Sequence, residues 1–171
     1  MGTVALAVLA LLAGCQSTKD AENEIMQRGP GLEAALRSPN SAATGVIRLF
    51  DVRDGVSVQM TINNLLPGTY RISLHETGNC SSRNLFSAGP AWAPPGSTKP
   101  PGELLPEFIV NPGADMTIYV GLISGARTDG PVSMRKRSVI VHWGAKVGEA
   151  FPGQPNNRLA CGVLDTVESP R

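Results

Sequence analysis

The sequence feature that most constrains the fold is a strict alternation of apolar and polar residues over 56–62. Apolar side chains stand at every second position of this segment, namely Val56, Val58, Met60 and Ile62. A period of two puts these side chains on one face of an extended chain, so the segment is predicted to be a half-buried strand. The turn residues Arg53-Asp54-Gly55 precede it and predict a hairpin with an earlier strand over 45–52.

The following hundred or so residues repeat this pattern of short strands and turns. Nineteen glycines and fourteen prolines favour many turns and argue against a helical bundle. Two long segments without helical periodicity, 76–106 and 144–157, are predicted to be loops that are functional or held in place. Seven or eight short strands predict an all-β fold, an antiparallel Greek-key sandwich or barrel of about eight strands. Beyond the first hairpin, the predicted strands are 69–75, 107–110, 115–123, 132–143 and 159–167.

The N-terminal residues predict a membrane anchor and not a part of the fold. An apolar run over 4–13 has the length of a signal peptide and is too short to span a bilayer. It ends in Leu12-Ala13-Gly14-Cys15, which resembles the cleavage box of bacterial lipoproteins, with Cys15 as the lipid-bearing residue. Gln16 after this cysteine is typical of sorting to the outer membrane. No Lys or Arg precedes the run, so either the true start lies upstream or the signal is weak.

These features predict three regions. Residues 1–15 are a lipoprotein signal peptide, 16–43 a flexible tether and 44–171 the β domain. Residues 33–37 are compatible with one helical turn, but no periodicity in the tether indicates an element that anchors a core. The expected location is the bacterial cell envelope, with the protein lipid-anchored to the outer membrane and facing the periplasm. A net charge of +1 indicates no nucleic-acid partner.

The three cysteines fit this location. Lipidation of Cys15 leaves Cys80 and Cys161, which are expected to pair in an oxidising compartment. Such a bridge closes a loop of roughly 80 residues and stabilises the fold by about 4.5 kcal/mol on the chain-entropy model. The alternative is a pair of buried free thiols.

Several segments of the predicted domain resemble the copper/zinc superoxide dismutase family in its bacterial form. The longest is Asn64-Leu-Leu-Pro-Gly-Thr-Tyr-Arg-Ile-Ser-Leu-His75-Glu-Thr-Gly-Asn-Cys80, which is similar to the family's turn, metal-ligand strand and disulfide cysteine. Shorter matches are Ser87-Ala-Gly-Pro-Ala91, Gly102-Glu-Leu-Leu-Pro106 and Arg158-Leu-Ala-Cys161-Gly-Val163. The resemblance covers residues 44–167 in order, and it implies the family's Greek-key fold.

The resemblance implies a copper site of four histidines, of which two remain. The family's His-x-His pair, whose period of two puts both rings on one side of a strand, reads Ser73-Leu74-His75 here. The histidine that bridges the two metals falls at Ala91, and the last copper histidine falls at His142. His75 and His142 are therefore the candidate residual copper ligands, because imidazole nitrogen suits copper. Their alternative role is that of hydrogen-bonded strand residues.

The same resemblance implies that zinc is not bound. No histidine lies between Pro94 and Glu103, where the family places its zinc ligands, and Pro100 stands at the last of those positions. Glu103, at the place of a ligating aspartate, leaves one carboxylate for a metal that takes four ligands. A second aspartate of the family, which orients both metal shells, falls at Lys146, whose charge opposes a cation. The chain has two histidines in all, so no other alignment restores the full site.

Three further residues lie next to these positions. Arg158 stands where the family has the arginine that guides the superoxide anion, so it is the candidate catalytic residue. Its alternative role is backbone hydrogen bonding beside the disulfide. Trp92 and Trp143 each adjoin a former ligand position and are predicted to fill the space that the metals would occupy.

Two functions follow from this reading. In the first, the chain is a superoxide dismutase-like envelope lipoprotein with a half-lost copper site, which binds copper weakly at His75 and His142 and has weak or no dismutase activity. Copper and superoxide are then its expected ligands. In the second, it is a metal-free β-sandwich that serves as an envelope binding or structural module, with no cofactor. Whether the chain is an enzyme, its protein partner and its oligomeric state stay open at this point.

Overall fold

The computed structural model describes residues 31–129, 133–144 and 156–167. These residues form one sheet of ten antiparallel strands and a single 3₁₀ turn, η1, at Phe86–Ala88. The predicted signal peptide, Cys15, most of the predicted tether and Lys146 lie outside the described residues. Within the described ranges, no helix is long and apolar enough to cross a membrane. The strands are β1 (Leu32–Arg37), β2 (Thr44–Val52), β3 (Gly55–Asn63), β4 (Gly68–His75), β5 (Ala91–Trp92), β6 (Phe108–Val110), β7 (Met116–Ser124), β8 (Ser138–Trp143), β9 (Arg158–Val163) and β10 (Asp165–Thr166).

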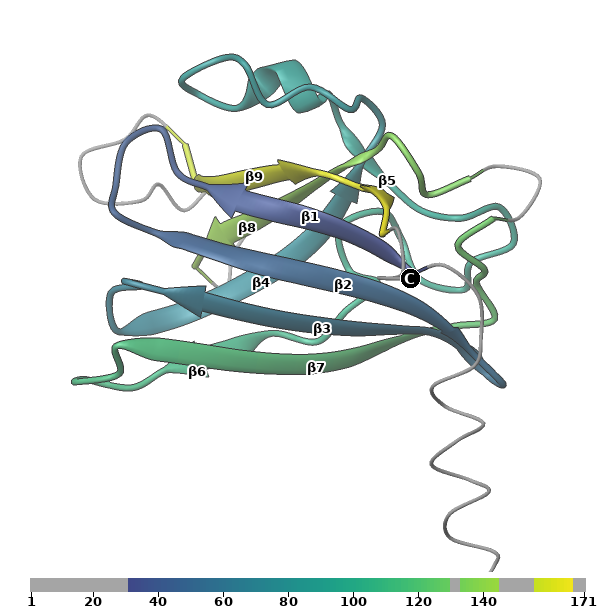
Figure 1. Cartoon of the computed structure of the whole chain (residues 1–171), viewed down its shortest axis with the longest axis horizontal. Coiled ribbons are helices and arrows are strands. Elements are labelled where there is room, and N and C mark those ends of the chain that lie inside the picture. Colours follow the sequence, from purple (N-terminus) through teal and green to yellow (C-terminus); the bar gives the residue numbers. More distant parts are fainter. Residues whose placement is uncertain (1–30, 130–132, 145–155, 168–171) are drawn as a thin grey trace, which may run out of the picture.

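The sheet is curled into a half-barrel, which confirms the predicted all-β fold. Its main path runs β5-β4-β8-β9-β1-β2-β3-β7, with β6 paired to β4 and β10 paired to β1. Figure 1 shows β1, β2, β3 and β7 side by side across the front of the molecule, with β4 and β8 behind them. The chain leaves β3 and joins a non-adjacent strand, β4, which is the crossing expected of a Greek key.

The core lies inside this curl. The alternating residues that predicted β3 point into it, because Val56, Val58, Met60 and Ile62 are all at most 1% exposed. Most other strands also start and end close to the predicted residues. Two differ: the segment predicted over 132–143 forms a strand from Ser138 onward, and the segment predicted over 159–167 breaks at Leu164 into β9 and β10.

The prediction of a flexible tether over 16–43 is wrong for residues 32–37. Leu32–Arg37 is not a flexible segment or a helical turn but strand β1, which lies between β2 and β9 in the sheet. Leu32, Ala34 and Leu36 are at most 3% exposed and belong to the core. The six residues Leu-Glu-Ala-Ala-Leu-Arg have high helix propensity, but pairing with two neighbouring strands overrides that local preference.

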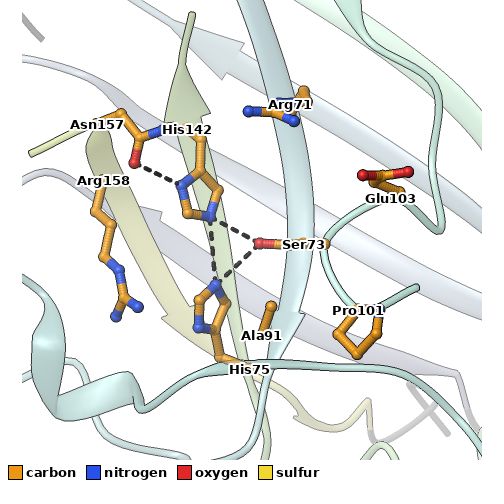
Figure 2. A pocket seen from close by; sticks show the side chains of 10 residues that line it. Arg71, Ser73, His75, Ala91, Pro101, Glu103, His142, Asn157 and Arg158 are labelled. Atoms are coloured by element: carbon orange, nitrogen blue, oxygen red, sulfur yellow. Dashed lines mark hydrogen bonds between the residues drawn. The ribbon is translucent and has the colours of Figure 1, made fainter. Parts of the chain in front are cut away.

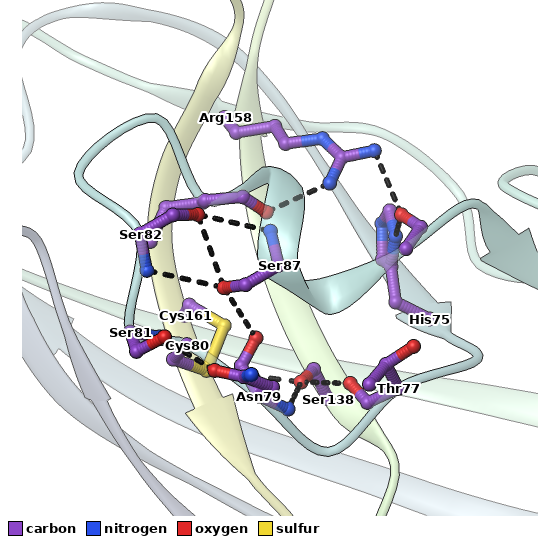
Figure 3. Close-up of a disulfide and its surroundings, with 12 residues drawn as sticks. His75, Thr77, Asn79, Cys80, Ser81, Ser82, Ser87, Ser138, Arg158 and Cys161 are labelled. Carbon is purple, nitrogen blue, oxygen red and sulfur yellow. Dashed lines mark hydrogen bonds between the residues drawn. A yellow bond between two sulfur atoms is a disulfide. The ribbon is translucent and has the colours of Figure 1, made fainter.

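The predicted disulfide is confirmed. Cys80 and Cys161 are bonded, with their Cα atoms 5.8 Å apart and 81 positions apart in the sequence. Ser138 supports the bridge: its hydroxyl donates to Thr77 O at 2.6 Å and accepts from Asn79 N at 3.1 Å. Figure 3 shows these bonds beside the two sulfur atoms. The bridge therefore ties the loop after β4 to β9.

Candidate functional site

A cavity of about 240 Å³ opens beside the loop after β4. It lies on the face of β4 that points away from the core, since Tyr70, Ile72 and Leu74 fill the core face. Figure 2 shows the side chains that enter it from β4, β8 and the neighbouring loops. Those that carry polar chemistry are Arg71, Ser73, His75, Glu103, His142, Asn157 and Arg158.

Strand geometry brings these side chains together. Arg71, Ser73 and His75 stand at alternate positions of β4, so all three point to the same side of the sheet. His142 of the adjacent strand β8 pairs with Arg71 in the antiparallel register. The structure therefore unites the two predicted ligands, His75 and His142, which are far apart in the sequence.

Each imidazole is oriented by an oxygen atom at its Nδ1. His75 Nδ1 donates to the carbonyl of Gly89 at 2.9 Å, because that oxygen can only accept. His142 Nδ1 lies 3.2 Å from Oδ1 of Asn157, which likewise accepts. Both Nδ1 atoms then carry the hydrogen of a neutral ring, and both Nε2 atoms carry a lone pair.

The two Nε2 lone pairs face one another. His75 Nε2 and His142 Nε2 are 3.3 Å apart, and Ser73 Oγ lies 2.9 Å from the first and 2.7 Å from the second. A hydroxyl has one hydrogen, so Ser73 satisfies one of the two nitrogens and leaves the other without a donor. Three electron-rich atoms thus converge on a point where a proton or a cation would be stabilised.

Burial keeps both rings neutral. Removal from water lowers the pKa of His75 and the pKa of His142 from 6.5 to about 4. The positive charge of Arg158 is a smaller cause of both decreases, and Arg71 contributes to that of His142. The hydrogen bonds to Gly89 and Asn157 raise the two pKa values but do not overcome burial. Neutral imidazole is the form that ligates a metal.

The cavity offers part of the donor set of a copper site and one carboxylate at the predicted zinc position. Within residues 31–129, 133–144 and 156–167, no three side chains of the His, Cys, Asp and Glu types converge as a metal site. Glu103 lines the cavity, but the histidines of a zinc site have no counterpart around it, and Ala91 and Pro101 offer no donor there. A copper ion in the cavity would have two imidazole nitrogens and the neutral hydroxyl of Ser73 as donors.

Arg158 fulfils the structural role that the sequence left open. Its guanidinium donates to Leu85 O at 2.8 Å and to Gly89 O at 2.9 Å, and it stands over the ring of Phe86. Figure 3 shows Arg158 holding this part of the loop from β9. The same guanidinium also lines the cavity, where an anion could reach it. Its guidance of superoxide stays a prediction.

The tryptophan prediction is wrong, and two residues of the site were missed. Neither Trp92 nor Trp143 lines the cavity: Trp143 packs edge-on against Tyr70, and Trp92 lies beneath Arg137. Asn157 orients His142 from the residue before β9 and carries no sequence signal of that role. Arg71 had such a signal, since it stands two residues before Ser73 on the same strand face.

Comparison with known proteins agrees with this geometry. The family model described as copper/zinc superoxide dismutase (SODC) matches residues 43–164. This range contains both histidines of the cavity, both cysteines of the disulfide and every strand from β2 to β9. A search of curated proteins finds no match.

Proposed function

Because this chain belongs to the copper/zinc superoxide dismutase family, we propose that it is a bacterial envelope lipoprotein whose cavity holds one copper ion at His75 and His142. It has no zinc site and little or no dismutase activity. The proposal makes the protein a copper-binding relative of the enzymes whose fold it has. Superoxide remains a ligand that the cavity can attract.

The observation that carries copper binding is the opposed pair of Nε2 atoms, 3.3 Å apart. Two lone pairs at this distance repel each other, and Ser73 has one hydrogen to offer the two nitrogens, so a cation placed against both would be stabilised. The oxygen atoms at each Nδ1, from Gly89 and Asn157, fix the ring orientation in the way that outer contacts fix metal-ligating histidines. The low pKa values of both rings keep the nitrogens free of protons over the whole range above about pH 4.

Efficient dismutation is not expected from these donors. Bound copper would supply one-electron redox chemistry, for which the oxidised ion prefers four nitrogen or oxygen ligands in a tetragonal arrangement. Ser73 offers a neutral hydroxyl in place of an imidazole, and Ala91 offers nothing. Arg71 and Arg158 line the cavity, and their positive charges would attract the superoxide anion into it.

One observation favours the metal-free module as a second candidate. The charges of Arg71 and Arg158 disfavour a second cation nearby, since they already lower the pKa of His142. In that case the His75, Ser73 and His142 cluster is a hydrogen-bonded structural element, and the cavity serves to bind another ligand.

Copper loading separates the two candidates. The full-length protein is loaded with copper, freed of excess metal and analysed for copper and zinc, and superoxide removal is then measured in a xanthine oxidase assay. We expect close to one copper per chain, no zinc and activity near that of buffer. His142→Ala should abolish copper retention, whereas Ser138→Ala, next to the disulfide, should not. Copper that is absent, or that persists in His142→Ala, would overturn the copper proposal.

The envelope location rests on the Leu12-Ala13-Gly14-Cys15 sequence. Cells that express the protein are labelled with a fatty-acid analogue and separated into membrane and soluble fractions. Labelled protein should appear in the outer membrane, and Cys15→Ser should lose both the label and the membrane fraction. A Cys15→Ser variant that still labels would contradict the lipid anchor.

A further inference from the structure

Arg71 is a polar side chain of the cavity that is mostly buried and incompletely bonded. Its side chain is only 14% exposed and lines the cavity. Among the described residues, none accepts a hydrogen bond from it, and its ion-pair partner is Glu107, with Nε and Oε1 3.8 Å apart. That distance is longer than a hydrogen bond, and Glu107 itself is 42% exposed. Arg71 therefore has a mostly buried side chain and unused N–H donors, which an acceptor in the cavity would satisfy.

The position of Arg71 directs it into the cavity. It continues the row of Ser73 and His75 along β4, one alternate position further, and it pairs across the sheet with His142. Figure 2 shows its guanidinium on the same side of the strand as Ser73. The cavity of about 240 Å³ gives room for a ligand of several non-hydrogen atoms, since one water takes roughly 30 Å³ of liquid volume.

The charges around this space favour an anion. Arg71 and Arg158 are both cationic, the two imidazoles are neutral, and Glu103 is the carboxylate that lines the cavity. Arg158 uses two of its five N–H groups on Leu85 O and Gly89 O, whereas no described residue accepts a hydrogen bond from the guanidinium of Arg71. A planar guanidinium with unused donors binds two oxygen atoms of one group side by side.

We propose that Arg71 forms a binding site for a small oxyanion, a short carboxylate or an inorganic oxyanion, that presents two oxygen atoms to its guanidinium. The site lies in the same cavity as His75 and His142 but does not depend on copper. Arg158 contributes charge and Arg71 contributes the hydrogen bonds. Glu107 competes with the ligand for Arg71 and holds the guanidinium in place when no ligand is bound.

The test uses the full-length protein in detergent with a chelator that keeps it free of copper, so its outcome is independent of copper binding. Acetate and inorganic phosphate are titrated while the backbone amide signals of β4 and β8 are followed by NMR. Acetamide, which has the size of acetate without its charge, is the ligand control. We expect saturable shifts centred on Arg71, Ser73 and His142 with acetate or phosphate, and none with acetamide.

Variants locate the site. Arg71→Gln should weaken binding by about tenfold or more, because it removes the charge and the paired donors of the guanidinium. Arg48→Gln, which removes an exposed arginine on the outer face of β2, should leave binding unchanged. Glu107→Gln should strengthen binding, because it removes the competing carboxylate. Arg71→Lys separates the two ligand sources: it keeps a point charge for phosphate and loses the paired donors that suit a carboxylate.

Some outcomes would overturn the proposal. Equal shifts with acetamide, or equal affinity in Arg71→Gln and the unchanged protein, would show that the cavity does not recognise an anion through Arg71. Weaker binding in Glu107→Gln would show that Glu107 positions the ligand site and does not compete with it. If copper binding fails in the earlier experiment and the anion titration succeeds, the oxyanion site stands by itself.

Discussion

The disulfide-bearing loop and the histidine cavity both adjoin strands β4 and β8. The two regions differ in how their polar groups are paired. Beside the disulfide, donors meet acceptors, as the hydroxyl of Ser138 does with Thr77 O and Asn79 N. In the cavity two acceptor atoms meet, since Nε2 of His75 faces Nε2 of His142. The loop is stabilised by contacts within the chain, while one of the two Nε2 atoms in the cavity has no donor among the described residues.

This difference indicates that the loop keeps its conformation without a ligand in the cavity. The contacts that hold the loop come from covalent chemistry and from Arg158, whose bonds to Leu85 O and Gly89 O need no metal. A change of ligand in the cavity is therefore not expected to disturb the sheet. The following experiments test whether stability resides on the loop side and ligand sensitivity on the cavity side.

The largest effect is expected from the disulfide. Replacing Cys80 and Cys161 together by alanine opens a loop of 81 residues and should lower the free energy of unfolding by about 4 kcal/mol. Urea unfolding of the double variant and of the oxidised protein measures the difference. A loss below about 1 kcal/mol would mean that the hydrogen bonds of Ser138 hold the region without the bridge.

The next effect concerns β1, which supports both regions through β9. Leu36 is 1% exposed, and Leu36→Ala should cost about 3 kcal/mol, because it leaves a cavity in the core. Arg37→Ala, at the neighbouring exposed position, should cost less than about 0.5 kcal/mol. Equal urea midpoints for the two variants would contradict the placement of β1 in the sheet.

On the cavity side, the stability of the copper-free protein should depend on pH. Above about pH 6.5 His75 and His142 are neutral in both the folded and the unfolded chain, and they contribute nothing. Between about pH 6.5 and about pH 4 the unfolded chain binds protons that the folded chain rejects, so stability falls as the pH falls. We expect a loss on the order of 2 kcal/mol, since one proton can be shared between the two rings.

The control for this pH dependence is His142→Gln, measured by urea unfolding over the same range. The variant should have a flatter profile, because one of the two buried imidazoles is gone. An unchanged profile would place the acid sensitivity elsewhere, for instance in the exposed ion pairs of Asp165, whose pKa is held well below its usual range by Lys136 and Arg135.

The smallest effect is expected where the two regions meet. Arg158→Lys keeps the charge but cannot donate to both Leu85 O and Gly89 O in the same geometry, and it should cost about 1–2 kcal/mol. Amide hydrogen exchange over residues 85–89 should become faster, while exchange in β3 should not change. Protection of 85–89 that stays the same would remove Arg158 from the framework of the loop.

The sequence by itself determined most of the strands and the chemistry available to the site. Alternation at Val56, Val58, Met60 and Ile62 required a strand with one buried face, and the count of two histidines limited the imidazole donors that any site could offer. The disulfide followed from the same kind of count. These inferences are local or compositional, so they did not depend on how the strands pair.

Strand pairing, and the side-chain positions that follow from its register, were decided only by the tertiary structure. Residues 32–37 have the composition of a helix, yet they are a strand because two neighbouring strands offer hydrogen bonds and a core surface. Nothing in the sequence aligns the Nε2 atoms of His75 and His142 or places Arg71 opposite His142. Those relations come from the antiparallel register of β4 and β8, in which a shift by one residue would turn Arg71, Ser73 and His75 to the other face.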